Sequence, residues 1–251
     1  MRFAVLGLGE AGAALARDLV AAGAEVAGYD PATGGPPGVR EAAGAGEAVA
    51  GAAVVLSVNS AAVAERLAAQ AMPAAPPGSV WADLNTAPPA AKERLAGLAE
   101  RHRLEFADVA LLAAVPPRGL ATPSLACGPG ARTYAEAVRP LGGSVELLDA
   151  PPGAAAARKL IRSTVMKGFA AAILESLAAA RAAGCEQWVR AGLDEQLGAE
   201  WVERLVTGSA QHAARRTAEM DAAAELLRTL GVVPRVTEAA RDVLAALAAG
   251  G

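Results

Sequence analysis

Apolar positions recur along the chain at two different spacings, and the change from one to the other divides it into two regions. Up to about residue 150, short continuous apolar runs alternate with stretches in which apolar residues recur every three or four positions. Such runs are typical of buried strands, and the longer spacing is typical of helices. From Pro151-Pro152-Gly153 onward only the helical spacing remains. The pattern predicts an α/β domain with a doubly wound, mostly parallel sheet over residues 1–152, followed by an all-helical domain over residues 153–251.

The first domain is predicted to contain seven strands and four helices. Strands are expected at residues 2–6, 25–29, 52–58, 79–84, 104–109, 124–127 and 145–148, and helices at 13–22, 60–70, 90–102 and 131–139. In the helix expected at 90–102, Leu95 and Leu98 should face inward and the charged residues outward. Residues 31–38 are rich in Pro and Gly and read as a loop rather than a full crossover helix.

The second domain is predicted to begin with one unusually long helix. Residues 154–183 keep the helical spacing as far as Gly184, a residue suited to closing a helix. One or two helices are expected at 187–206, and others at 210–230 and 237–248. A helix that starts at a domain junction and runs this far is a natural spine for an all-helical domain.

The clearest chemical signal lies between the first strand and the first helix. Gly7, Gly9 and Gly12 fit the pattern G-x-G-x-x-G directly after the strand 2–6. Gly7 would allow a tight turn, Gly9 the approach of a pyrophosphate to the backbone, and Gly12 close packing of helix on strand. The helix N-terminus adds unpaired N–H groups and the positive end of its dipole. Although an ordinary strand-turn-helix with permissive glycines is the alternative, this context favours a Rossmann-type dinucleotide site.

Asp30, at the end of the second strand, predicts which dinucleotide binds. Its carboxylate falls where it would accept a hydrogen bond from the adenosine ribose 2′-hydroxyl. Its charge would repel a 2′-phosphate, and residues 31–33 bring no arginine, so NAD is favoured and NADP remains possible. The residues expected to contact the cofactor are Gly7, Leu8, Gly9, Glu10, Ala11, Gly12, Asp30, Val58 and Asn59.

Composition narrows the class of protein. A net charge of -3 with scattered arginines predicts no nucleic-acid partner. No secretory signal is visible, and Glu175 interrupts the most apolar helix, so we expect no membrane span and no membrane partner. Cys127 and Cys185 form neither a disulfide framework nor a metal-ligand cluster, so no metal site is expected and a reducing cytoplasm suits the chain.

Lys159 is the candidate for proton transfer. It lies near the start of the long helix, which should close over the carboxyl ends of the strands, and Ser163 one turn further shares its face. A lysine in a cofactor cleft can donate a proton as the ammonium and accept one as the amine. On periodicity alone, a solvated helix lysine is an equally good reading of Lys159. Lys167 is rotated away and is expected at the surface or in a supporting position, and Arg215-Arg216 as an exposed pair.

These segments resemble the β-hydroxyacid dehydrogenase superfamily, which includes 3-hydroxyisobutyrate, tartronate semialdehyde and 6-phosphogluconate dehydrogenases and the related imine reductases. The glycine segment is similar to the family's Gly-Leu-Gly-x-Met-Gly, and residues 83–89 resemble its Asp-x-Ser-Thr-x-x-Pro. The long helix carries the most specific match, because the family's Gly-x-Gly-x-x-x-Lys-x-x-Asn-Asn meets Gly153, Ala155, Lys159, Arg162 and Ser163. The resemblance covers nearly the whole chain.

The resemblance implies an NAD(P)-dependent oxidoreductase that acts on a small hydroxy acid or a related alcohol or carbonyl. It makes Lys159 the general acid/base and places Asn85, Thr86, Leu112 and Ser163 at the substrate. It also implies a homodimer formed through the helical domain.

Three departures from the family pattern concern the substrate. The family's Ser-Gly-Gly becomes Leu-Ala-Ala at residues 112–114, and Arg162 and Ser163 replace an Asn pair. The family's Lys-Asp falls on Ala218-Glu219, which leaves Arg215 or Arg216 to supply positive charge. These changes look more like the phosphogluconate-dehydrogenase-like branch with its own C-terminal domain. An imine reductase, which the apolar Leu112 would suit, and a non-catalytic NAD(P)-binding or sensor protein are the alternatives.

Overall fold

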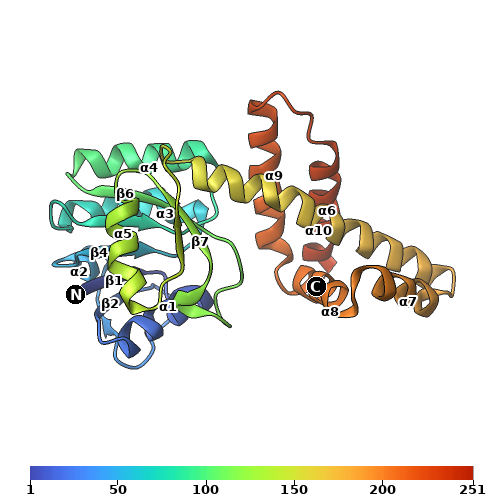
Figure 1. Ribbon diagram of the computed structural model, residues 1–251, viewed down its shortest axis with the longest axis horizontal. Helices are drawn as coiled ribbons and strands as arrows, with labels where there is room; N and C mark the ends of the chain where they lie inside the picture. The colour runs from blue at the N-terminus through green and yellow to red at the C-terminus, as the bar shows by residue number, and fades with distance from the viewer. Residues whose placement is uncertain (251) are drawn as a thin grey trace. The chain divides into compact units, whose positions relative to one another are not determined.

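The computed structural model describes residues 1–250, and the chain divides into two compact units, Met1–Lys159 and Leu160–Gly251. The first unit contains the sheet and the second consists of helices (Figure 1). The predicted fold class, a Rossmann sheet followed by an all-helical region, is confirmed. The division between the units falls inside the long helix, whereas the predicted boundary between residues 152 and 153 lies at its start.

The first unit is built on an eight-stranded sheet with the strand order β3-β2-β1-β4-β5-β6-β7-β8. All neighbouring strands run parallel except β6 and β7, which are antiparallel. The strands are β1 (Arg2–Leu6), β2 (Glu25–Tyr29), β3 (Arg40–Glu41), β4 (Val54–Ser57), β5 (Val80–Asp83), β6 (Glu105–Leu111), β7 (Ser124–Cys127) and β8 (Val145–Leu147). Because the chain builds outward in both directions from the adjacent β1 and β4, the carboxyl ends of these strands border the crevice where such sheets bind ligands.

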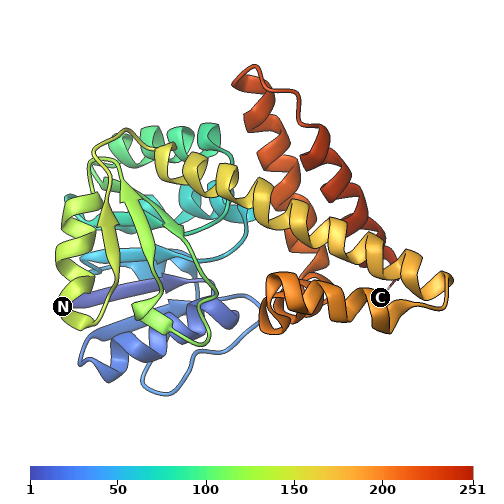
Figure 2. The same cartoon turned by 45° about the vertical axis from the view of Figure 1, so that its right-hand side comes forward.

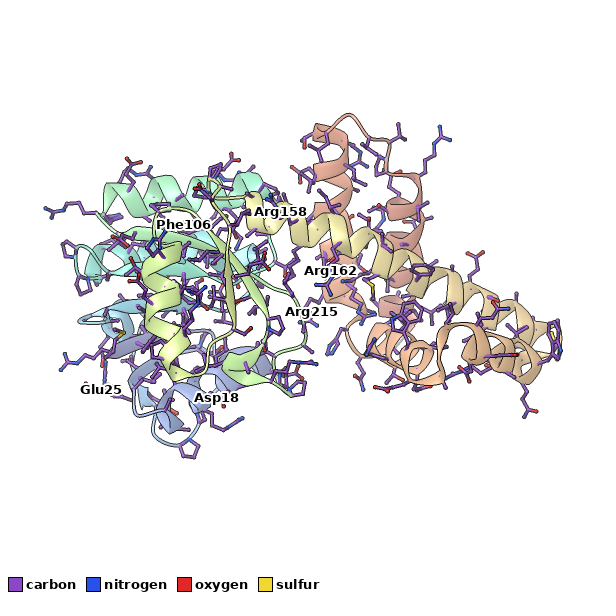
Figure 3. The ribbon with its side chains drawn as sticks, in the orientation of Figure 1. Asp18, Glu25, Phe106, Arg158, Arg162 and Arg215 are labelled. Atoms are coloured by element: carbon purple, nitrogen blue, oxygen red, sulfur yellow. The ribbon has the colours of Figure 1, made fainter. Side chains whose placement is uncertain are left out.

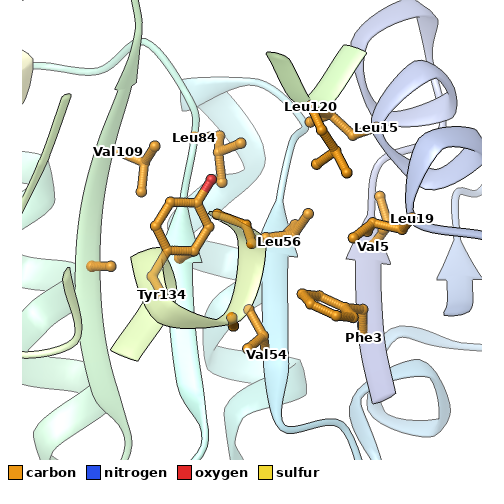
Figure 4. Packing of buried hydrophobic residues seen from close by; sticks show 14 of the residues in the cluster. Phe3, Val5, Leu15, Leu19, Val54, Leu56, Leu84, Val109, Leu120 and Tyr134 are labelled. Carbon is orange, nitrogen blue, oxygen red and sulfur yellow. The ribbon is translucent and has the colours of Figure 1, made fainter. Parts of the chain in front are cut away.

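Helices cover both faces of this sheet (Figure 2). They are α1 (Glu10–Ala21), α2 (Ala45–Val49), α3 (Ala61–Ala71), α4 (Pro89–Arg101) and α5 (Ala131–Val138), with short 3-10 turns at η1 (Met72–Ala74), η2 (Gly119–Ala121) and η3 (Arg139–Leu141). Alternate strand residues enter different cores: Phe3 and Val5 join the cluster with Leu15 of α1 (Figure 4), whereas Ala4 joins the cluster with Leu95 of α4. Burial on both faces explains why the strands are continuous apolar runs rather than alternating ones.

The predicted elements of the sheet are present, with three differences. The region after the loop at residues 31–38 contains the two-residue strand β3 and the single-turn helix α2, both too short to leave a periodic signal. Strand β6 continues to Leu111, beyond its predicted end, because it pairs with β7 in the register Leu111↔Ser124. The expectation that all charges of the fourth helix face outward is wrong for Lys92, whose side chain is fully buried.

The second unit consists of the remainder of α6 (Ala154–Ala182) with α7 (Glu186–Leu197), α8 (Ala199–Gln211), α9 (Ala213–Thr229) and α10 (Arg235–Gly250). The segment 187–206 forms parts of two helices, because Gly198 adopts a φ of +87° between them. Ile173 and Leu177 of α6 pack against Val202 and Leu205 of α8 in the core of this unit.

Helix α6 is long and apolar enough, by length and composition alone, to cross a membrane. By this criterion, the expectation from the sequence that no helix could span a membrane does not hold. A third of its most apolar window is buried within the protein, and core helices of soluble proteins meet the same criterion, so the finding is weak evidence for a span.

Candidate active site

The glycine loop, residues 7–12, is shaped by close backbone contacts at the end of β1. Gly7 has a φ of +103°, and a Cβ there would lie 2.3 Å from the Val58 carbonyl oxygen. A Cβ on Gly12, inside α1, would lie 1.8 Å from the Gly7 carbonyl oxygen. By contrast, a Cβ on Gly9 would meet no atom within 4 Å, so this backbone is accessible. The loop therefore fits a dinucleotide, whose pyrophosphate must approach the backbone at the start of α1.

Asp30 braces the glycine loop from the end of β2. Its Oδ2 accepts a hydrogen bond from the Leu8 amide at 2.8 Å, and its Oδ1 accepts from the amides of Ala32 at 2.9 Å and Thr33 at 3.1 Å. A carboxylate oxygen can accept more than one hydrogen bond, so Oδ2 retains capacity for a ribose hydroxyl. Asp30 thus stands where the sequence predicts it and also holds the loop in shape.

The other predicted cofactor residues lie along the same edge of the sheet. Glu10 and Ala11 begin α1, and Val58 and Asn59 follow β4. The Asn59 amide nitrogen donates to Ser57 Oγ at 3.1 Å, whereas its buried Oδ1 has no hydrogen-bond partner among the residues described. The predicted set is therefore brought together at the ends of β1, β2 and β4.

Lys159 lies beside a second group of residues at the ends of β5 and β6. Its Nζ donates a hydrogen bond of 2.7 Å to Thr86 Oγ1, although the two residues are 73 positions apart. Both side chains are partly buried. They line a small pocket formed by Asn85, Thr86, Ala87, Asp108, Val109, Ala110, Ala156 and Lys159. The structure thus joins the predicted catalytic lysine to two of the predicted substrate residues.

Asn85, in the wall of this pocket, is held by the protein through its amide nitrogen. That nitrogen donates to Asp83 Oδ1 at 2.5 Å and to Ser57 Oγ at 3.1 Å. Its Oδ1 is buried and has no hydrogen-bond partner among the described residues. These two hydrogen bonds fix the orientation of Asn85 in the pocket wall.

A buried charge network that the sequence did not reveal lies next to the pocket. Lys92 Nζ forms ion pairs with Asp83 Oδ2 at 2.6 Å and with Asp108 Oδ1 at 3.3 Å, and it also donates to the Asp83 carbonyl at 2.8 Å. Burial lowers the pKa of Lys92, but the two carboxylates outweigh burial and raise it overall, so the ammonium form is favoured. The available signal was a pair of aspartates at the ends of adjacent strands and a lysine in the first turn of the helix after one of them.

The first turn of α6 is held by side chains from β6 and β7. Asp108 Oδ2 accepts hydrogen bonds from the amides of Gly153 at 3.0 Å and Ala156 at 3.1 Å, and Cys127 Sγ accepts from the Ala155 amide at 3.3 Å. Burial and the nearby Asp108 raise the pKa of the Cys127 thiol to about 11. These contacts satisfy amides that have no partner within a helix.

The contacts of the other two predicted substrate residues are with their own surroundings. Leu112 packs against the small apolar cluster that includes Leu125 and Cys127. Ser163 belongs to the helical unit, where its hydroxyl hydrogen-bonds to Glu219. Lys167 also pairs with Glu219, at 2.9 Å, with only 16% of its side chain exposed, so it supports the helical unit rather than lying free at its surface.

The predicted arginine pair is split. Arg215 is exposed on α9 (Figure 3), as expected. Arg216 is half-buried and donates to Ser209 Oγ at 2.6 Å, so the expectation of an exposed pair is wrong for this residue. Burial lowers the pKa of Arg216, and the charge of Glu219 opposes that effect.

Comparison with known proteins identifies both parts of the chain. Residues 2–113 match the NAD binding domain of 6-phosphogluconate dehydrogenase, and residues 180–247 match a domain of unknown function, DUF1932. A 3-hydroxyisobutyrate dehydrogenase from Salmonella typhimurium has the same fold, with a TM-score of 0.84 at 19% identity over 100% of this chain and 95% of that one. The chain therefore joins a domain similar to the NAD binding domain of 6-phosphogluconate dehydrogenase to a DUF1932 domain.

Other structures similar to this chain extend the comparison. A conserved hypothetical protein of Sinorhizobium meliloti is 29% identical, with a TM-score of 0.74 over 98% of this chain and 87% of that one. A reductive aminase from Aspergillus terreus, in complex with NADPH and ethyl levulinate, is 21% identical, with a TM-score of 0.66 over 100% and 94%. A search of curated protein sequences finds no match. The first unit of the protein thus carries an NAD(P)-binding domain.

Proposed function

We propose that this protein transfers a hydride between a nicotinamide cofactor and a small hydroxy acid or a related alcohol or carbonyl, with Lys159 as the general acid/base. The observation that carries the proposal is the hydrogen bond of 2.7 Å between Lys159 Nζ and Thr86 Oγ1 in a pocket at the strand ends. The match of residues 2–113 to the NAD binding domain of 6-phosphogluconate dehydrogenase supports the same class of reaction.

The chemistry divides between the cofactor and the chain. The nicotinamide, when bound, supplies or accepts the hydride. In reduction the Lys159 ammonium gives a proton to the substrate oxygen as charge develops there, and in oxidation its amine takes the hydroxyl proton. The hydrogen bond to Thr86 orients the Lys159 ammonium within the pocket.

Lys159→Met tests the assignment, since it keeps the length of the side chain and removes the amine. We expect turnover to fall at least about 100-fold, the usual contribution of a general acid/base, while the Kd for NADH stays within about twofold. The matched control is Arg158→Ala, which removes an exposed cation from the same turn of α6 and should leave turnover near wild type. Unchanged turnover in Lys159→Met would refute the role of Lys159.

An imine reductase is the second candidate, favoured by the similarity to the reductive aminase and by the apolar Leu112. A panel of 2- and 3-hydroxy acids, their carbonyl forms and cyclic imines, assayed with NAD(H) and NADP(H), would separate the two reactions. Tight NADH binding without turnover of any compound would instead favour a sensor protein. We expect turnover of carbonyl compounds rather than imines. We also expect a preference for NAD over NADP, because the Asp30 carboxylate would repel a 2′-phosphate.

We further propose a homodimer formed through the helical unit. Ile161, Val165 and Phe169 recur every four residues along α6, and their exposed fractions are 46%, 57% and 46%. Val236 of α10 extends this apolar surface, because a Cβ on Gly168 of α6 would lie 3.3 Å from its Cγ1. A second copy of the chain is the occupant expected for such a surface in this family. A cytoplasmic location suits the two free thiols.

A further inference from the structure

The buried network of Lys92, Asp83 and Asp108 takes no direct part in the proposed reaction, yet Asp108 lines the pocket. We propose that Lys92 is a positioning residue that aligns the Lys159 amine with the Thr86 hydroxyl. The inference rests on the proposed function, because it concerns the same lysine. One series of contacts leads from the Lys92 ammonium to Thr86, and a second series leads to Lys159.

The first series of contacts reaches Thr86 through β5. Lys92 Nζ contacts the Asp83 carboxylate at 2.6 Å and the Asp83 carbonyl at 2.8 Å, so it fixes both the side chain and the main chain at the strand end. The other carboxylate oxygen accepts a hydrogen bond of 2.5 Å from the Asn85 amide. Asn85 directly precedes Thr86, so the turn that presents the Thr86 hydroxyl depends on the ion pair.

The second series of contacts reaches Lys159 through β6. Lys92 Nζ lies 3.3 Å from Asp108 Oδ1, and Asp108 Oδ2 accepts hydrogen bonds from the Gly153 and Ala156 amides in the first turn of α6. A carboxylate is favoured at a helix N-terminus by both the unpaired amides and the dipole. Lys159 follows Ala156 by three residues, so the position of its side chain depends on that first turn.

The Lys92 ammonium lies between two buried carboxylates and balances their charge. All three side chains are at most 1% exposed, and without the cation two carboxylates would remain in a site that water does not reach. The two carboxylates would then repel each other and lose the cation that holds them, so the contacts that they make with Asn85 and with the start of α6 should shift. The cofactor edge at β1, β2 and β4 contains none of these residues, so the loss should affect alignment rather than NAD(H) binding.

The basic composition of the chain supports a specific role for an ammonium group here. Among 23 lysine and arginine residues only Lys92, Lys159 and Lys167 are lysines, and each contacts a named partner inside its own unit. An ammonium is a compact charge with three donors, whereas a guanidinium is planar and larger. A compact cation is what fits between two buried carboxylates and a main-chain carbonyl.

Lysine-selective NMR can test the inference, because the full chain yields only three lysine side-chain signals. In Lys92→Met we expect the Lys159 signal to move toward its position in Thr86→Val, which breaks the hydrogen bond directly. We also expect kcat to fall about tenfold or more while the KM for NADH changes less than twofold. In the control Lys167→Met, the Lys159 signal should stay in place.

The inference is overturned if the Lys159 signal stays at its wild-type position in Lys92→Met, whatever happens to stability. If Lys92→Met does not fold, Asp83→Asn is the second variant, with the same expected displacement and the same contrary outcome. The NMR result needs no turnover, so it is separable from failure of the proposed function. If the proposed function failed, the wild type would transfer no hydride, but the displacement of the Lys159 signal could still be measured.

Discussion

Single residues of the glycine loop serve either the fold or the cofactor. Gly7 and Gly12 are glycines because the protein itself occupies the space that a Cβ would need. Gly9 faces open space, so its requirement comes from the ligand that approaches it. Substitution by alanine should therefore separate stability from binding.

Gly12→Ala should lower the free energy of unfolding by about 1–3 kcal/mol or more, because the new Cβ would lie 1.8 Å from the Gly7 carbonyl oxygen and push α1 away from β1. Gly9→Ala should change the free energy of unfolding by no more than about 1 kcal/mol, the usual size of the difference between glycine and alanine. The same variant should raise the Kd for NADH about tenfold or more. Thermal unfolding and NADH fluorescence titration measure the two quantities. Wild-type NADH affinity in Gly9→Ala would contradict the assigned role of this residue.

Residue identities alone revealed part of the site. Gly7, Gly9, Gly12 and Asp30 could be predicted because their spacing is local and follows directly from a strand and a helix start. Lys159 was predicted through the family resemblance. Lys92 was not, because its burial depends on where α4 begins relative to the ends of β5 and β6, and helical spacing carries no information about that.

At the scale of elements, the start of α6 depends on strands distant in sequence. Cys127 of β7 and Asp108 of β6 both accept hydrogen bonds from its first amides. These contacts make the helix start sensitive to the protonation of a buried thiol, because an ionised Cys127 would lie next to the Asp108 carboxylate.

The Cys127 thiol should make stability fall at high pH. Its pKa is raised from 9.0 to about 11 by burial and Asp108, so the unfolded chain loses the proton first. The contribution of the protonated Cys127 thiol to the free energy of unfolding is complete below about pH 9 and is lost as the pH rises toward 11. The total loss is on the order of 2 kcal/mol. Urea unfolding at pH 8 and pH 10.5 would measure this loss, which should be smaller in Cys127→Ala and unchanged in Cys185→Ser, whose thiol is exposed. An equal loss in Cys127→Ala and wild type would exclude this explanation.

The elements themselves could be predicted where a run of residues was long enough to show a period. Strand β1 and helix α6 match their predicted ranges within a residue, because burial on both faces and helical spacing are visible in the sequence. Strand β3 and helix α2 are too short for a period to emerge. The antiparallel direction of β7 is a property of pairing, which no local pattern encodes.

At the scale of the whole molecule, the exposed apolar surface of α6 predicts self-association. Val165→Glu places a charge in the middle of the Ile161, Val165 and Phe169 row and should convert a dimer to a monomer in sedimentation velocity at micromolar concentration. Trp188→Glu is the matched control, because Trp188 is 80% exposed on a different helix, α7. A wild-type monomer, or dissociation by Trp188→Glu alone, would contradict an interface on α6.

The inward placement of all three lysines has a practical consequence. Over residues 1–250, positive charge at the surface comes from arginine, so reagents that acylate or alkylate amines find few side chains to attack. Lys92 is fully buried, and Lys159 and Lys167 are both partly buried and engaged in contacts within their own units. Amine-directed labelling, which on most enzymes modifies many surface lysines, should therefore attach few groups to this one, with the exposed Met1 amine as the most accessible target.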